Sequence, residues 1–91
     1  MKTIEIDLRC IKTVRALHIY LQYRLGLPAH YGRNLDALYD CLTEIPGETC
    51  LVVYPDTTPS AEMAAFLPRL GRVLEDAQQA NPGLHVREAG A

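Results

Sequence analysis

Asp36 and Asp40 are the two residues of this sequence that are best placed to do chemistry. They stand four residues apart in a stretch whose leucines recur at helical spacing. Both carboxylates therefore fall on one face of a predicted helix, together with Tyr39 and Thr43. Paired carboxylates can serve as acid and base in glycosidic cleavage, can hold a hard cation, or can bind a cationic partner. Like charges at this spacing repel mildly, so helix stability does not explain the pair.

The catalytic and metal-binding interpretations both lack supporting groups. Tyr39 is the only aromatic side chain on the same face, and no histidine or third carboxylate is placed to complete a metal shell. A chain this small also has little room for a deep substrate cleft. Cys41 with His18 or His30 could form a nucleophile pair, but Cys41 points away from the aspartates and is better interpreted as a core thiol. We therefore predict no enzymatic activity, no metal and no cofactor.

Charge is distributed unevenly along the chain. The net charge is only −2, yet residues 34–68 contain six acids and no lysine or arginine. Six of the nine basic residues lie at or before Arg33. Such an acidic block argues against nucleic acid as a direct ligand, and it favours either a positively charged partner or no ligand at all. The face that carries Asp36 and Asp40 is thus either a solvated surface or a site for something cationic.

The helix that carries these aspartates has its own start and burial signals. Asn34 is a good N-cap residue, and Gly32 lets the chain turn into that cap. Leu35, Leu38 and Leu42 fall within a narrow arc that points away from the acids. We therefore expect a short helix with its leucines buried and its carboxylates exposed.

Three other segments have the patterns of β-strands. Residues 3–8 alternate apolar and polar side chains, residues 50–54 form an apolar run typical of a strand buried on both faces, and residues 84–87 form a short last strand. Helical crossovers between successive strands favour parallel pairing. The order β-α-α-β-α-α-β therefore predicts one α/β domain over residues 1–91, with a three-stranded parallel sheet packed with helices.

Two longer segments have helical periodicity. Residues 13–25 form an amphipathic helix that ends at Gly26. His18 lies beside the apolar stripe of this helix, where a packed or hydrogen-bonded histidine is expected rather than a catalytic one. Residues 61–80 are also helical in period, but Pro68 removes a backbone donor. That segment is predicted to be a helix pair or one bent helix.

The sequence favours a cytoplasmic protein. Its first residues alternate charged and apolar side chains without a signal-peptide core, and no apolar run approaches membrane-spanning length. Cysteine usage agrees with this, because Cys10, Cys41 and Cys50 are odd in number and have no metal-site spacing. In a reducing compartment we expect them to remain free thiols.

Residues 25–43 resemble the central segment of the barstar family of intracellular ribonuclease inhibitors. The resemblance rests on the run HYGRNLDALYDCLT at residues 30–43, which Gly26-Leu27-Pro28 precedes. Both aspartates are in register with that family, and chain length and element order also fit. The resemblance implies three parallel strands covered by helices, and a basic ribonuclease as the protein partner.

The resemblance also implies a role for individual residues. In that family one aspartate enters the ribonuclease active site and takes the place of substrate phosphate. That aspartate corresponds to Asp40, while Asp36 matches a supporting acidic contact and Thr43 a contact at the rim of the interface. Inhibition then consists of filling the site and blocking substrate entry.

Several interface positions depart from the family pattern. Tyr39 replaces a tryptophan, His30 a tyrosine, Arg33 an acid and Glu44 a glycine. In the last helix Asp76 matches one of two flanking interface acids, and the second is lost. The anchor is kept while the rim has changed, which indicates a cognate ribonuclease other than barnase, because rim residues set the choice of partner.

Two hypotheses for function remain open. The chain is either an inhibitor of a ribonuclease or a barstar-like interaction module for another basic protein. Under both, we expect a monomer when free, with no direct contact to nucleic acid or membrane. The candidate partner-binding residues are His30, Asp36, Tyr39, Asp40, Thr43, Glu44 and Asp76.

Overall fold

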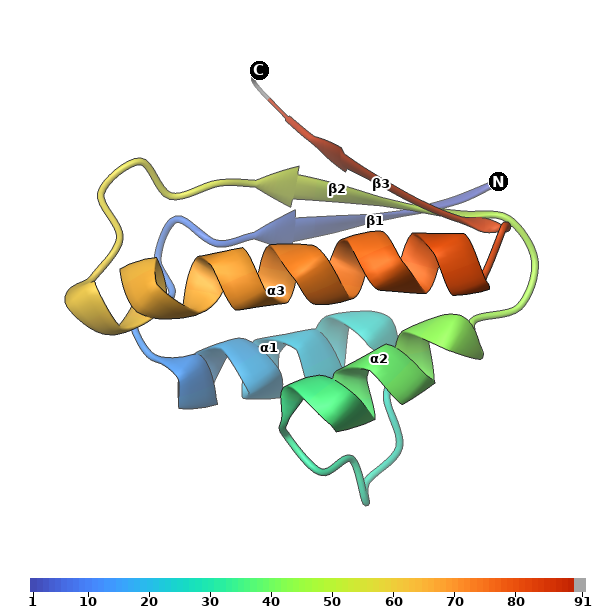
Figure 1. The fold of residues 1–91 in the computed structure, drawn as a ribbon, viewed down its shortest axis with the longest axis horizontal. Coiled ribbons are helices and arrows are strands. Elements are labelled where there is room, and N and C mark those ends of the chain that lie inside the picture. Colours follow the sequence, from blue (N-terminus) through green and yellow to red (C-terminus); the bar gives the residue numbers. More distant parts are fainter. Residues whose placement is uncertain (90–91) are drawn as a thin grey trace.

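A parallel β-sheet forms one layer of the structure, and helices form the other (Figure 1). The computed structural model describes residues 1–89. Within these residues the elements are β1 (Lys2–Asp7), α1 (Val14–Leu25), α2 (Leu35–Thr43), β2 (Thr49–Tyr54), α3 (Ala61–Ala80) and β3 (Leu84–Glu88). The predicted α/β class and the three-stranded parallel sheet are both confirmed.

The sheet has β2 at its centre, with strand order β1-β2-β3. Ile4 pairs with Leu51, which pairs with Val86 on its other side, so these apolar side chains line one face together. The helices lie against this face alone (Figure 1). The prediction that β2 is buried on both faces is confirmed at its centre, where Leu51 on the helix side is 2% exposed and Val52 on the open face is 3% exposed. Val52 on the open face is buried because neighbouring strands and their side chains flank it.

The segment with Pro68 differs from its prediction. The prediction was a helix pair or one bent helix; the pair, which the predicted element order used, is wrong, because α3 runs as one helix from Ala61 to Ala80. Pro68 is exposed, and so is Ala64, whose carbonyl would have accepted the missing hydrogen bond. Water can reach that carbonyl, and the apolar face of α3 keeps its burial on both sides of the proline. Tertiary packing thus outweighs the local cost of the proline.

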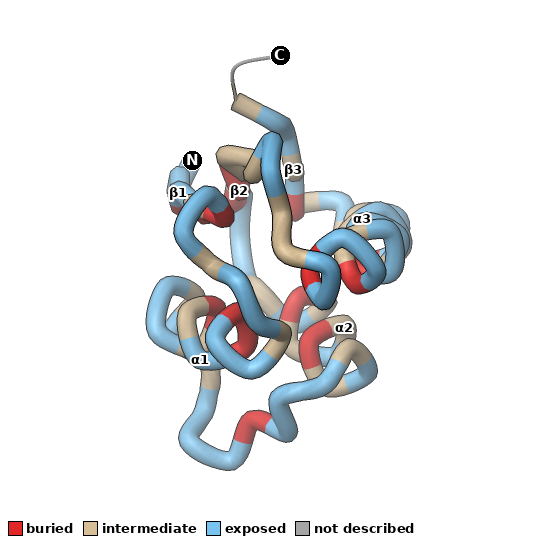
Figure 2. The backbone as a smooth tube through the Cα atoms, turned by 90° about the vertical axis from the view of Figure 1, so that its left-hand side faces the viewer, coloured by how far each residue is buried: buried red, intermediate tan, exposed pale blue. Residues whose placement is uncertain are grey.

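The core lies between the sheet and the helices, where buried segments of every element meet (Figure 2). Leu38 and Leu42 of α2 are fully buried there, with 0% of each exposed, and Leu35 is half-buried. The predicted leucine face of α2 is therefore confirmed. Leu17 of α1 and Met63 of α3 occupy the same core.

Helix side chains cap both edges of the sheet. On β1, the Asp7 N–H donates to the hydroxyl of Tyr20 over 2.9 Å, and Arg24 Nε donates to the carbonyl of Glu5 over 3.0 Å. On β3, the Val86 N–H donates to Gln78 Oε1 over 3.0 Å. These bonds occupy main-chain groups that would otherwise be free to pair with another strand.

None of the helices in residues 1–89 is long and apolar enough to cross a membrane. The cysteine thiols are free: Cys10 is exposed, while Cys41 and Cys50 are half-buried.

The burial of Leu38 generates a stability prediction. Leu38→Ala should lower the free energy of unfolding by about 2–5 kcal/mol, because it leaves a cavity in a packed core. Urea unfolding followed by circular dichroism measures this, with Leu35→Ala as the half-buried comparison. A loss below about 1 kcal/mol for Leu38→Ala would mean that α2 is not held by its leucines.

Candidate functional site

The helix α2 begins at a well-made N-cap. Asn34 has extended backbone angles, and its Oδ1 accepts a hydrogen bond from the Ala37 N–H over 2.8 Å. Its Nδ2 donates to the carbonyl of Gly32 over 3.2 Å, which fixes the turn before the helix. The predicted cap is confirmed. The first turn of α2 is therefore rigidly placed, and Asp36 lies within it, where the helix dipole favours a carboxylate.

One side of α2 carries the residues that the sequence singled out. Asp36 and Asp40 are exposed, while Tyr39 and Thr43 are half-buried beside them. We call these four residues the acidic face of α2. The structure brings them together as the helical spacing predicted, because the opposite side of the helix is anchored in the core.

The hydroxyl of Thr43 is already engaged within the helix. Its Oγ1 donates to the main-chain carbonyl of Asp40 over 2.8 Å. A partner can therefore use Thr43 only as a hydrogen-bond acceptor or through its methyl group. Glu44 is the C-cap of α2, with an exposed side chain that extends the acidic face by one position.

The remaining predicted residues come from other elements. His30 is exposed in the loop between α1 and α2, and Asp76 is exposed on α3, which packs against α2. Neither forms a hydrogen bond or ion pair with α2 within the described part of the chain. Asn81 holds the ends of α2 and α3 together, because its Nδ2 donates to the carbonyls of Leu42 and Ile45, each over 3.0 Å.

The aspartates of α2 have no cationic partner in residues 1–89. The salt bridges found there use the carboxylates of Asp7, Asp56 and Glu48 instead. The local potential is negative: burial first, and then the Glu44 and Asp40 carboxylates, raise the pKa of the Cys41 thiol. The acidic face thus presents uncompensated negative charge to solvent.

Sequence reasoning missed the role of Tyr31, which had no periodic pattern to mark it. Tyr31 is buried, and its hydroxyl lies 2.7 Å from Nδ1 of His18 on α1. The Phe66 ring packs against the same imidazole in a T-shaped arrangement, with ring centroids 5.9 Å apart. The prediction of a packed or hydrogen-bonded His18 is confirmed. This contact ties the loop before α2 to α1 and α3.

Burial sets the protonation of this pair. It lowers the pKa of His18 and raises that of Tyr31 to about 12. His18 is therefore neutral near neutral pH, and the Tyr31 hydroxyl can donate to its Nδ1. Within residues 1–89 the imidazole has no ionised hydrogen-bonding partner, so a protonated His18 would be a buried charge without compensation.

Arg33 is the second residue that the sequence left without a structural role. Its φ of 53° lies in the left-handed region, where a side chain costs of order 1–3 kcal/mol. Its guanidinium lies 3.4 Å from Gln22 Oε1 on α1. A cation therefore stands immediately before the acidic face.

The acidic face lies on a surface and not in a cleft. Cavities of about 420 and 370 Å³ lie elsewhere in the described residues and contain no residue of α2. No group of three metal-ligating side chains is found in the described residues. An exposed helix of this kind is suited to contact a protein surface, because its carboxylates can enter a partner's pocket.

The fold is a small α/β domain with an exposed acidic helix face. Residues 1–88 match the family model of Barstar, described as barnase inhibitor, and the chain belongs to the barstar family. A protein of Bacillus subtilis (strain 168) with the name "Putative ribonuclease inhibitor YrdF" is 51% identical to this chain over 43 residues. That match spans about half of each protein, 47% of this chain and 47% of its relative.

The buried histidine generates a pH prediction. Because the pKa of His18 is lower in the folded than in the unfolded state, its contribution to stability is full above the unfolded value of 6.5 and is lost as pH falls toward the folded pKa. Urea unfolding midpoints should therefore fall between about pH 7 and pH 5.

The control for this prediction is His18→Gln, which keeps a polar side chain but does not titrate. Its unfolding midpoint should change less over the same pH range, although its stability at neutral pH will be lower. If the wild type and His18→Gln lose stability in parallel, the titration of another group causes the effect. His30→Gln, which changes an exposed imidazole, should follow the wild type.

Proposed function

We propose that this protein inhibits a basic ribonuclease by placing the acidic face of α2 over its active site. The observation that carries the proposal is the pair of exposed, unpaired carboxylates, Asp36 and Asp40, on a rigid helix of a barstar-family domain. The name of the Bacillus subtilis relative supports the same target class.

The chemistry of inhibition follows from how a ribonuclease holds its substrate. Its active site must bind phosphate with arginine, lysine and histidine side chains. A carboxylate that enters this site accepts the same charge-assisted hydrogen bonds as phosphate oxygens do. It offers no scissile phosphodiester, and the helix behind it blocks the approach of RNA. Asp40 therefore acts as a substrate mimic that cannot be cleaved.

Asp40 is the anchor in this proposal because of its position. It lies in the second half of α2, and Asp36, Tyr39 and Thr43 border it on the same face. The half-buried Tyr39 and Thr43 can exclude water from a carboxylate that is pressed into a partner, which is the arrangement of an interface hot spot. Asp36 supplies a second charge one turn away.

His30, Glu44 and Asp76 form the rim of the proposed interface. They come from the loop before α2, the end of α2 and the neighbouring α3. Rim charges act mainly on association and on partner choice. Arg33 adds a cation on this side of the molecule, so a cognate ribonuclease should offer it an acceptor. Because we expect the target to offer Arg33 this acceptor, we propose that it is a ribonuclease other than barnase.

The cellular role follows from this activity. A cytoplasmic inhibitor would protect the cell from its own ribonuclease or from that of a neighbour, and it would be monomeric until it meets its target.

The second candidate is a basic protein that is not a ribonuclease, because the exposed, unpaired carboxylates of Asp36 and Asp40 would attract any basic surface. Affinity capture from the native cell with the wild-type protein and with Asp40→Ala separates the two candidates. A basic protein captured only by the wild type supports the proposal if it cleaves RNA and is inhibited by the wild type. If it has no ribonuclease activity, the second candidate is correct.

The anchor role of Asp40 leads to a binding prediction. Asp40→Ala should weaken the complex with the cognate ribonuclease by more than about tenfold, a loss above 1.4 kcal/mol, because the partner's cations are left unpaired. Its thermal unfolding should stay close to that of the wild type, since Asp40 is exposed. Isothermal titration calorimetry and thermal melts measure the two quantities.

The matched control is Glu88→Ala, which removes an exposed carboxylate from β3. It should bind the ribonuclease within about threefold of the wild type, because it only makes the net charge less negative, by one unit. If Asp40→Ala and Glu88→Ala bind equally well, Asp40 is not the anchor.

The acidic block leads to a kinetic prediction. Association with the ribonuclease should slow markedly as salt is raised, because exposed charges are screened over about 10 Å at 0.1 M. Dissociation should change less, since contacts buried in the complex are screened less. Stopped-flow measurements over a range of salt concentrations test this. An association rate that does not change with salt would show that the block does not steer the partner.

A further inference from the structure

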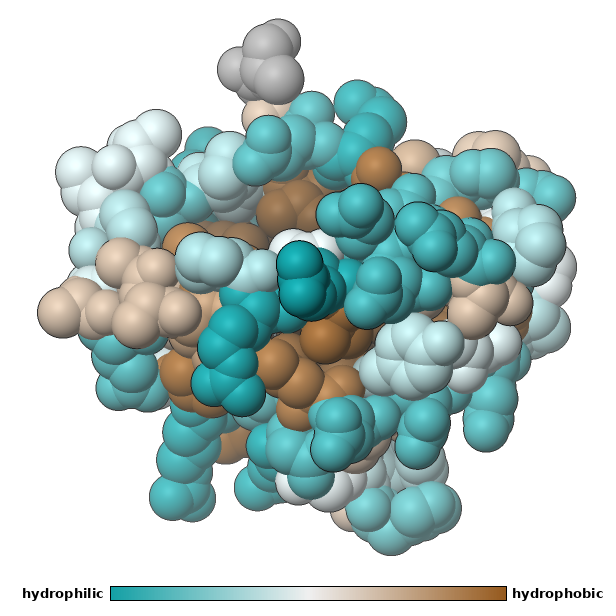
Figure 3. Space-filling view, viewed as in Figure 1, coloured by the Kyte–Doolittle hydropathy of each residue, from teal (hydrophilic) through white to brown (hydrophobic). Residues whose placement is uncertain are grey.

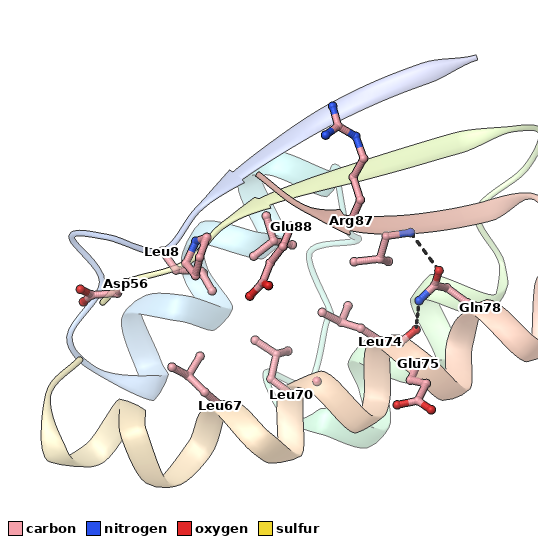
Figure 4. Close-up of a pocket in the computed structure, with 13 residues that line it drawn as sticks. Leu8, Asp56, Leu67, Leu70, Leu74, Glu75, Gln78, Arg87 and Glu88 are labelled. Atoms are coloured by element: carbon pink, nitrogen blue, oxygen red, sulfur yellow. Dashed lines mark hydrogen bonds between the residues drawn. The ribbon is translucent and has the colours of Figure 1, made fainter. Parts of the chain in front are cut away.

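A groove of about 420 Å³ opens between α3 and β3, away from the acidic face of α2 (Figure 4). Its floor is apolar, and the space-filling view shows hydrophobic surface lying in hollows between hydrophilic side chains on this side of the molecule (Figure 3). The apolar residues that line it are Leu8, Val53, Leu67, Leu70, Leu74 and Val86.

Two features keep this groove open. The strand β3 turns away from α3 toward its C-terminal end (Figure 1). On α3, Gly71 lines the groove, and a Cβ added there would meet no atom within 4 Å. A glycine inside a helix costs about 1 kcal/mol relative to alanine. Within residues 1–89 no atom occupies the position of that Cβ, which leaves room there for a ligand.

The charged residues at the groove indicate what kind of ligand it can bind. The side chain of Glu88 points into the groove, while that of Arg87 points to the opposite side of the sheet (Figure 4). Glu75 lies at the rim, on α3. Neither glutamate forms a salt bridge within residues 1–89, whereas Asp56 is paired with Lys12 at 2.5 Å. A net negative charge therefore stands over the apolar floor.

The main chain of β3 offers further contacts. The Ala89 N–H donates to the carbonyl of Val53 over 2.8 Å, so residues 85, 87 and 89 face β2 and residues 84, 86 and 88 face the free edge. Gln78 occupies the N–H of Val86. The N–H and carbonyl of Glu88 lie beyond this cap, beside the mouth of the groove.

We propose that this groove is a second protein-binding site, which takes an extended segment of a partner that carries lysine or arginine among apolar residues. The apolar side chains of the partner segment pack on the leucines of the groove floor, above Gly71. The aliphatic stem of the basic residue continues along that floor, and its charged end pairs with Glu88. The main chain of the segment pairs with the free edge of β3 at Glu88.

This site is independent of the acidic face of α2. The groove contains no residue of α2, so one molecule can hold a ribonuclease on α2 and a second partner between α3 and β3. The variant Asp36→Asn/Asp40→Asn should therefore lose the ribonuclease and keep the groove ligand. Failure of one proposal is thus distinguishable from failure of the other.

The test uses a short capped peptide of alternating leucine and lysine, titrated into the labelled protein and followed by amide NMR shifts. The shifts should concentrate at Gly71, Val86 and Glu88. Gly71→Leu fills the groove and should weaken binding by more than about tenfold, while Arg72→Leu adds the same side chain at an exposed position of α3 and should bind within about twofold.

The charge is tested separately. Glu88→Gln should weaken binding of the leucine–lysine peptide about threefold or more, and a peptide of alternating leucine and glutamate should not bind. This pair of measurements stands even if Gly71→Leu does not fold. The proposal is overturned if Glu88→Gln has no effect, if the shifts fall on α2, or if the same amides shift with protein concentration alone, which would assign the groove to a second copy.

Discussion

Burial of the leucine face of α2 is the constraint on which the proposed function depends. Leu38 and Leu42 are inaccessible to solvent, so α2 cannot rotate without exposing apolar surface. The same contacts determine which way Asp36 and Asp40 point. A carboxylate on a fixed helix loses little conformational freedom when it binds, and this preorganisation favours affinity. Core packing and binding are thus two consequences of one helix orientation.

The molecule keeps uncompensated carboxylates on two separate surfaces. On α2 they protrude from a convex helix, which suits entry into a partner's pocket. Between α3 and β3, Glu88 stands over an apolar hollow, which suits a partner that inserts its own side chains. Other carboxylates are paired locally: Arg9 forms a salt bridge with Asp7, and its hydrogen bonds lower the pKa of that carboxyl to about 2. Under both proposals, this unpaired negative charge is what would attract a basic partner.

The sequence by itself determined the local part of this protein. The period of the leucines, the cap at Asn34 and the stop at Gly26 define helices through contacts within a few residues, so they can be predicted without the fold. The same period placed Asp36 and Asp40 on one exposed face. The order of strands and crossovers was enough to predict a parallel sheet, because a helical crossover leaves few alternatives.

Only the tertiary structure decided features that depend on distant residues. The contact between His18 and Tyr31 joins positions 13 residues apart, and no local pattern pairs them. The helix continues through Pro68 because its apolar face is buried both before and after the proline. That stabilisation comes from packing against other elements, so the residues around the proline do not reveal it. The groove above Gly71 exists because the course of β3 leaves it open. The spacing of apolar residues indicates which face of an element is buried, whereas only the tertiary structure determines which residues pack against that face.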